Sequence, residues 1–99
     1  MKKILVCCNT GVSTSLLVAK MKQEAEARGL DADIEARPLS EAVAHLAEAD
    51  AVLLSPQVGF AQGSIQETSD VPLAVIEPDV YARADAAAIL DSAGALLGV

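Results

Sequence analysis

Three short, continuous apolar runs and one weakly alternating segment are spaced along the chain. The continuous runs cover residues 4–7, 51–54 and 73–76. Runs of this length without polar interruption are typical of strands that are buried on both faces of a parallel sheet. The segment 31–36 alternates only weakly between apolar and polar residues, and it predicts a further strand close to an edge of the sheet.

Helical patterns lie between and after these strands. From Ser13 to Arg28 apolar residues recur every four positions, and Gly29 stands where a left-handed C-terminal cap is expected. A second helix is predicted over residues 40–49, with Ser40 as its N-cap. The irregular range 59–68 predicts a short helix or a loop with one helical turn. The alanine-rich range 82–88 is helix-forming sequence. A C-terminal helix is predicted from an apolar stripe of Ile89, Leu90, Ala93, Leu96 and Leu97.

The predicted order of elements is βαβαβαβα over residues 1–99, without a linker or an internal repeat. This order predicts a single α/β domain, a four-stranded parallel sheet with helices on both faces and right-handed crossovers. All four strands then end at one edge, where ligands bind in open α/β sheets. Lys2 and Lys3 open the first strand and are expected at the opposite end. The ligand edge collects residues 8–13, 37–38, 55–57 and 77–79.

Composition supports a folded domain and excludes several classes of partner. The chain has 99 residues, of which 53% are apolar and 21% charged, and this is enough for one core. Its 14 acidic and 7 basic residues give a net charge of −7, so neither nucleic acid nor an anionic lipid surface is an expected partner. No apolar run is long enough for insertion into a membrane, and the N-terminus lacks the pattern of a signal peptide. We therefore expect a cytoplasmic protein.

The two cysteines, Cys7 and Cys8, are adjacent. They cannot connect distant segments, and a disulfide between neighbours would strain the peptide, so free thiols in a reducing compartment are expected. With only one histidine besides them, no set of four metal ligands can form, and neither a metal nor another cofactor is predicted. That histidine, His45, is expected on the surface of a helix away from the ligand edge.

The segment that directly follows the first predicted strand is the strongest candidate for chemistry. Free N–H groups and the helix dipole at a helix N-terminus hold a phosphoryl group without any lysine. The same field favours the thiolate, which is the nucleophilic form of cysteine, so Cys8 is the candidate nucleophile for covalent phosphoryl transfer. Glycine lets the backbone turn its amides inward, and the hydroxyls add donors. The candidate phosphoryl-binding residues are Asn9, Thr10, Gly11, Val12, Ser13, Thr14 and Ser15.

An alternative without chemistry stays open at this point. Cys8 could be a small buried hydrophobe and the segment an ordinary turn capped by Ser13. The combination of a cysteine, a glycine and four hydroxyls at a helix start favours the functional interpretation. Cys7 is expected inside the strand, with its side chain packed against a helix.

The pattern Cys-x-x-Gly-x-Ser-Thr-Ser-Leu-Leu after a short first strand resembles the enzyme IIB component of the sugar phosphotransferase system, in its lactose/cellobiose (N,N'-diacetylchitobiose) class. The segments around Gln57 and Tyr81 also resemble that family. The resemblance implies a flavodoxin-like fold and a carrier whose cysteine, here Cys8, accepts a phosphoryl group from a histidine of the IIA component. The acceptor it implies is a sugar, such as cellobiose, chitobiose or lactose, that enters through the membrane component IIC. Phe60, Gln62 and Gly63 depart from the cellobiose-type pattern.

Low-molecular-weight tyrosine phosphatases and related arsenate reductases are the main alternative, because they place a cysteine loop after the first strand of a similar sheet. They carry an arginine six positions after the cysteine, and here that position is Thr14. Without the guanidinium, the charge of the transition state loses its main fixed partner. A carrier has no use for such an arginine, because it must hold its phosphoryl group for the next acceptor. A nucleotide-binding module is less supported, since the first loop has neither a G-x-G-x-x-G pattern nor a Walker lysine.

Three more residues are expected near the ligand edge. Gln57 and Tyr81 are candidates to touch the phosphoryl group or a partner, although Tyr81 could equally cover the core. Asp79 is a candidate for the same contacts, and it is the residue that a phosphatase would use as its general acid.

Overall fold

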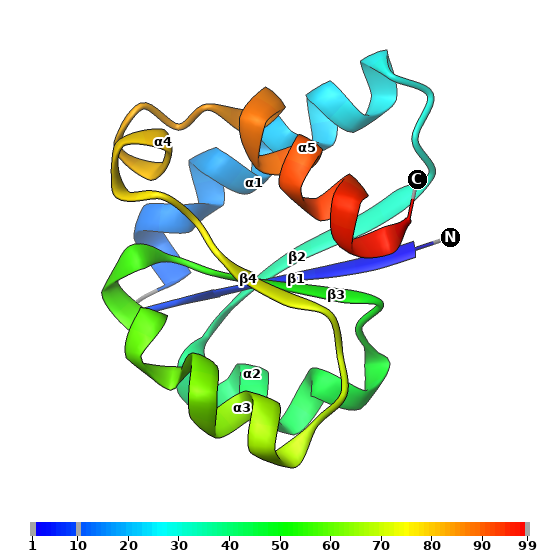
Figure 1. The fold of residues 1–99 in the computed structure, drawn as a ribbon. Coiled ribbons are helices and arrows are strands. Elements are labelled where there is room, and N and C mark those ends of the chain that lie inside the picture. The colour runs from blue at the N-terminus through cyan, green and yellow to red at the C-terminus, as the bar shows by residue number, and fades with distance from the viewer. Residues whose placement is uncertain (1, 10, 99) are drawn as a thin grey trace.

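A parallel four-stranded sheet forms the centre of the molecule, as the sequence predicted (Figure 1). The computed structural model describes residues 2–9 and 11–98, and for residues 11–14 it describes the backbone only. The strands pair in the order β2-β1-β3-β4, so the weakly alternating strand is an edge, as predicted. The strands are β1 (Lys2–Cys8), β2 (Ala32–Pro38), β3 (Ala51–Leu54) and β4 (Leu73–Val75).

Helices cover both faces of the sheet (Figure 1). One layer contains α1 (Gly11–Ala27), α4 (Pro78–Ala82) and α5 (Ala86–Leu97). The opposite layer contains α2 (Leu39–Ala42), the 3₁₀ helices η1 (Val43–Glu48) and η2 (Pro56–Ala61), and α3 (Gln62–Thr68).

The alternation of side chains along the central strand divides the core into two halves. Ile4 and Val6 pack under α1 and α5, whereas Leu5 and Cys7 pack under the layer of α2 and α3. All four are at most 1% exposed. Which layer a residue of β1 faces is therefore fixed by whether its number is even or odd.

The first helix begins at Gly11, two residues earlier than the predicted Ser13. Its end agrees with the prediction, because Gly29 adopts a φ of 70° and closes the helix. The N–H of Leu30 donates to the carbonyl of Ala25 over 2.9 Å, as in a left-handed C-terminal cap. The connection from β1 to α1 is consequently only two residues long, which holds the start of the helix close to the end of the strand.

Two other predicted helices are interrupted. The range 40–49 divides into α2 and η1, and Ser40 lies inside α2 and not at its cap, because the chain enters the helix directly from Pro38. The range 82–88 is also not one helix. Ala84 has a φ of 50°, and the Asp85 carboxylate accepts the N–H of Ala88 over 3.1 Å, so that α5 starts anew. The range 59–68 is helical, which is one of the two forms predicted for it.

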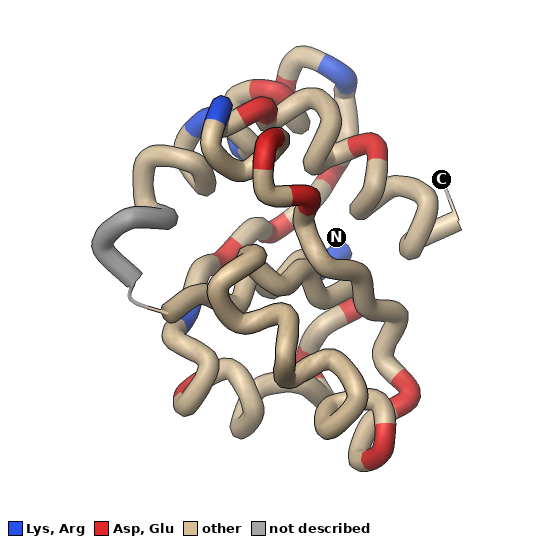
Figure 2. Tube along the Cα trace, turned by 60° about the vertical axis from the view of Figure 1, so that its left-hand side comes forward, with Lys and Arg blue, Asp and Glu red and all other residues tan. Residues whose placement is uncertain are grey.

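Acidic residues outnumber basic ones on both helical layers (Figure 2). Lys3, near the start of β1, is paired with Glu35 at 2.6 Å and Asp33 at 3.2 Å, and the hydrogen bond to Lys3 lowers the pKa of Glu35. Lys3 is thus held at the end of the sheet opposite to Cys8, as predicted. In the described part of the chain, no helix is long and apolar enough to cross a membrane.

Candidate functional site

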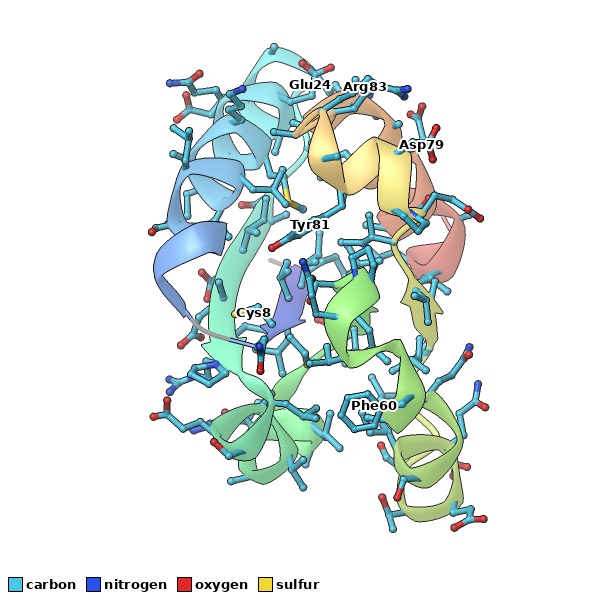
Figure 3. All side chains as sticks on the ribbon, turned by 90° about the vertical axis from the view of Figure 1, so that its left-hand side faces the viewer. Cys8, Glu24, Phe60, Asp79, Tyr81 and Arg83 are labelled. Atoms are coloured by element: carbon cyan, nitrogen blue, oxygen red, sulfur yellow. The ribbon has the colours of Figure 1, made fainter. Side chains whose placement is uncertain are left out.

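The topology of the sheet selects one position along its carboxyl edge. From β1 the chain moves outward to β2 and then returns past β1 to β3, so the strand order reverses between β1 and β3. Crevices that hold ligands in open α/β sheets lie at such reversals, beyond the carboxyl ends of the strands. The last residue of β1 is Cys8. The predicted nucleophile therefore lies at the position where this fold places its ligands (Figure 3).

Cys8 lies between a strand end and a helix start. Cys8 is 1% exposed, and its thiol donates to the carbonyl oxygen of Arg37 over 3.5 Å. The 17-residue helix α1 begins at Gly11 and runs back along the sheet, so its N-terminus and free N–H groups lie at the end of β1. Asn9, between the two elements, is exposed. Cys8 thus lies directly before the connection from β1 to α1.

The predicted phosphoryl-binding segment is only partly described. Thr10 lies outside the described residues, and the side chains of residues 11–14 do as well. The backbone of residues 11–15 forms the first turn of α1, and Ser15 is exposed. The structure thus supplies a helix N-terminus at the required place, while the individual roles of these residues stay predictions.

Cys7 occupies a different environment, as predicted. It is fully buried and packs with Leu5, Val52 and Leu54 under the layer of α2 and α3. Burial raises the pKa of the Cys7 thiol from 9.0 to about 11, and the neighbouring Cys8 adds to this effect. Cys7 is accordingly a protonated core side chain at neutral pH.

The structure brings one of the three additional candidates toward Cys8 and turns one away. Tyr81, on α4, is half-buried against the core under α1 and α5, and in Figure 3 it points toward the side of the molecule on which Cys8 lies. Asp79 points outward in the same view and pairs with Arg83 at 3.4 Å. Gln57 is exposed at the start of η2, just beyond β3. The tyrosine is therefore the better placed of the two residues from α4.

The sequence placed Ser55 at this edge, within the range 55–57, but assigned it no role. Its side chain is fully buried, and its Oγ has no hydrogen-bond partner among the described residues. Its own N–H donates to the carbonyl of Cys7 over 2.9 Å, which continues the ladder between β1 and β3. Its position at the end of an apolar run predicted the edge of the sheet, but a serine there by itself resembles an ordinary turn.

Two other features belong to the layer of α2 and α3. His45, on η1, pairs with Glu48 at 2.7 Å and is part of the layer opposite to α1. A groove of about 420 Å³ crosses the α2 and α3 layer and is bordered by Phe60, which is 81% exposed. Among the described residues, no three His, Cys, Asp or Glu side chains are grouped closely enough to hold a metal ion.

Comparisons with known proteins identify the family of this chain. Residues 3–92 match the family described as the lactose/cellobiose-specific IIB subunit of the phosphotransferase system. The chain is 42% identical over 88 residues to the oligo-beta-mannoside-specific EIIB component of Bacillus subtilis, covering 86% of this chain and 85% of that protein. It is 38% identical over 88 residues to the cellobiose-specific EIIB component of Lactococcus lactis, covering 81% of this chain and 82% of that protein.

Solved structures give the same result for the fold. The solution structure of a cellobiose-specific IIB component from Borrelia burgdorferi superposes with a TM-score of 0.81 at 27% identity, covering 98% of this chain and 92% of that one. A lactose-specific IIB domain from Streptococcus pneumoniae has a TM-score of 0.76 at 14% identity, covering 90% and 93%, and supports the fold alone. Members of the matched family are sugar phosphotransferases that work with IIA and IIC components. The chain therefore belongs to the lactose/cellobiose-specific IIB family of the sugar phosphotransferase system.

Proposed function

We propose that Cys8 is the phosphoryl carrier of this IIB component. In this proposal Cys8 accepts a phosphoryl group from a phosphohistidine of a IIA protein and passes it to a sugar held by a membrane IIC protein. The observation that carries the proposal is the position of Cys8 at the carboxyl end of β1, beside the reversal of strand order and next to the N-terminus of α1. Residues 1–99 then act as one IIB domain on the cytoplasmic side of the membrane.

The chemistry needs only a thiolate and a set of hydrogen-bond donors. The sulfur of Cys8 attacks phosphorus, the S–P bond forms as the N–P bond of phosphohistidine breaks, and the thiol proton passes to the released imidazole nitrogen. The hydrogen bond to the carbonyl of Arg37 is lost at that moment, because the sulfur no longer carries a proton. In the second transfer a sugar hydroxyl attacks phosphorus, and the thiolate leaves.

The N-terminus of α1 is suited to hold the transferred group. Its unpaired N–H groups and its dipole stabilise a dianion without a fixed cation. The candidates for direct contact are Asn9 and the residues of the first turn, with Tyr81 and Gln57 at the border. The absence of an arginine at Thr14 fits a carrier, since a guanidinium there would stabilise the transition state for loss of the group to water.

The alternative of a low-molecular-weight phosphatase has less support. Such an enzyme needs a general acid beside the leaving group, and the sequence offered Asp79 for that role. Asp79 instead points away from Cys8 and pairs with Arg83 (Figure 3). Both missing groups, the arginine and the acid, lead to the same preference for a carrier.

The acceptor that we propose is a β-linked disaccharide of the cellobiose, chitobiose or lactose type. Two similar proteins are named for oligo-beta-mannoside and cellobiose, which supports β-linked sugars, while a third is named for the monosaccharide galactose. A IIB domain contacts the sugar only during transfer, so the IIC partner determines which sugar is phosphorylated.

Phosphorylation with phosphoenolpyruvate, the general phosphotransferase proteins and a cognate IIA tests the proposal. Intact-mass analysis is expected to show one added phosphoryl group, and peptide mapping is expected to place it on Cys8. Cys8→Ser is expected to abolish the adduct, because an alkoxide is far harder to form than a thiolate, whereas Cys7→Ser is expected to retain it. An adduct on His45, or none with any matched IIA, would contradict the proposal.

A further inference from the structure

Ser55 has a buried hydroxyl that no described residue contacts by a hydrogen bond. A buried hydroxyl without a hydrogen bond destabilises a folded protein, because it has lost its bonds to water and gained none in return. Ser55 is 0% exposed, and its Oγ has no partner among the described residues. Such a group is unusual in a folded protein, and its location calls for a reason.

The register of the sheet places Ser55 beside Cys8. Cys7 pairs with Leu54, and the N–H of Ser55 donates to the carbonyl of Cys7, so the next pair along these strands is Cys8 with Ser55. Neighbouring parallel strands lie about 4.8 Å apart. Ser55 is therefore next to Cys8 across the β1/β3 reversal.

The two side chains also face the same layer. Along β1, Ile4 and Val6 face α1 and α5, and alternation assigns Cys8 to that side. Along β3, Leu53 faces α1 and α5 while Leu54 faces the other layer, and alternation then returns Ser55 to the side of Cys8. The unpartnered hydroxyl and the nucleophile thus share one face and one level of the sheet.

We propose that Ser55 donates its hydroxyl hydrogen to the anionic group at Cys8, first to the thiolate and then to an oxygen of the phosphoryl group. This inference rests on the proposed function. In the resting state the thiol of Cys8 donates toward β2, to the carbonyl of Arg37. Once the proton leaves, the sulfur becomes an acceptor, and a hydroxyl without another partner is available to it.

The proposed hydrogen bond from Ser55 to the anionic group at Cys8 is a strong, charge-assisted one. A hydroxyl that donates to an anion in a dry site contributes roughly twice as much as a neutral pair, and no other bond has to break first. Ser55 keeps its own proton throughout, because it stabilises the anion and does not act as an acid. Its effect is to favour the phosphorylated form of Cys8 over the free thiol.

Ser55→Ala tests the inference, with Ser92→Ala as the matched control. Ser92 is exposed on α5, where its hydroxyl donates to the carbonyl of Ala88 over 3.4 Å. In equilibrium with phosphorylated IIA, the ratio of phosphorylated to free protein is expected to fall about tenfold in Ser55→Ala and to stay unchanged in Ser92→Ala. Thermal unfolding is expected to show that Ser55→Ala is as stable as the wild type or more so, because the variant buries no unpaired hydroxyl.

A second measurement separates this inference from the proposed function. In a Cys7→Ala background, the rate of alkylation of Cys8 by iodoacetamide near neutral pH is expected to drop about tenfold on Ser55→Ala, because the thiolate loses a donor. This result does not require phosphorylation. If the wild type is phosphorylated but Ser55→Ala matches it in both assays, the inference is wrong and the proposed function stands. A loss of thermal stability that accounts for the loss of phosphorylation would also overturn it, in favour of a structural serine.

Discussion

The two adjacent thiols are expected to differ sharply in reactivity toward an alkylating agent. The comparison uses Cys8→Ser, which leaves only Cys7, and Cys7→Ala, which leaves only Cys8. Burial raises the pKa of Cys7 from 9.0 to about 11. At pH 8 this lowers the thiolate fraction of Cys7 from about one in ten to about one in a thousand, so the native rate is expected to fall about a hundredfold from that of an ordinary thiol.

Access adds to this difference. Exposure of Cys7 requires opening of the packed layer of α2 and α3, whereas Cys8 is the last residue of β1 and lies at the carboxyl edge of the sheet. Iodoacetamide labelling followed by mass spectrometry measures both rates, and the same variants unfolded in urea give the reference rate for each thiol. Labelling of native Cys7 within tenfold of its unfolded rate would refute the reasoning.

Three further predictions concern stability and the excluded chemistry. The pKa of Cys7 is raised in the folded state, so Cys7 contributes stability that is fully present below about pH 9 and lost as the pH rises to about 11. Over that window the free energy of unfolding of the wild type, measured in urea, is expected to fall by about 2–3 kcal/mol relative to Cys7→Ala. Gly29→Ala is expected to cost about 1 kcal/mol, because φ is 70° there, whereas Gly63→Ala, inside α3 with open space for a Cβ, is expected to be neutral or slightly stabilising in thermal unfolding. The wild type is expected to hydrolyse para-nitrophenyl phosphate very slowly, with no change in Asp79→Asn, and rapid hydrolysis that this variant abolishes would favour a phosphatase.

Most of the fold followed from periodicity. Continuous apolar runs identify strands that are buried on both faces, and the alternation of strands with helices predicts a parallel sheet. The errors lie where local side-chain chemistry competes with helix propensity. Asp85 caps α5 within an alanine-rich stretch, and Pro38 leads directly into α2, so Ser40 has no cap to form. Neither event changes the hydrophobic pattern, which is why the pattern missed both.

The candidate site was predictable in part. The position of Cys8 before a glycine and several hydroxyls predicted a nucleophile at a helix start, and the structure places it at the reversal of strand order. Ser55 was not identified, because its significance depends on strand order and register, which residues distant in sequence determine together. The orientation of Asp79, away from Cys8, depends likewise on how α4 packs.

The lifetime of the phosphorylated protein is the most direct test that Cys8 carries a phosphoryl group for transfer. The purified phosphoprotein is followed by intact-mass analysis in buffer alone and with membranes that contain the cognate IIC, with and without its sugar. The account predicts that the group persists in buffer and without sugar, and that it is lost rapidly, with formation of sugar phosphate, only when both membranes and sugar are present. Equal rates of loss under all conditions, with inorganic phosphate as the product, would contradict the account.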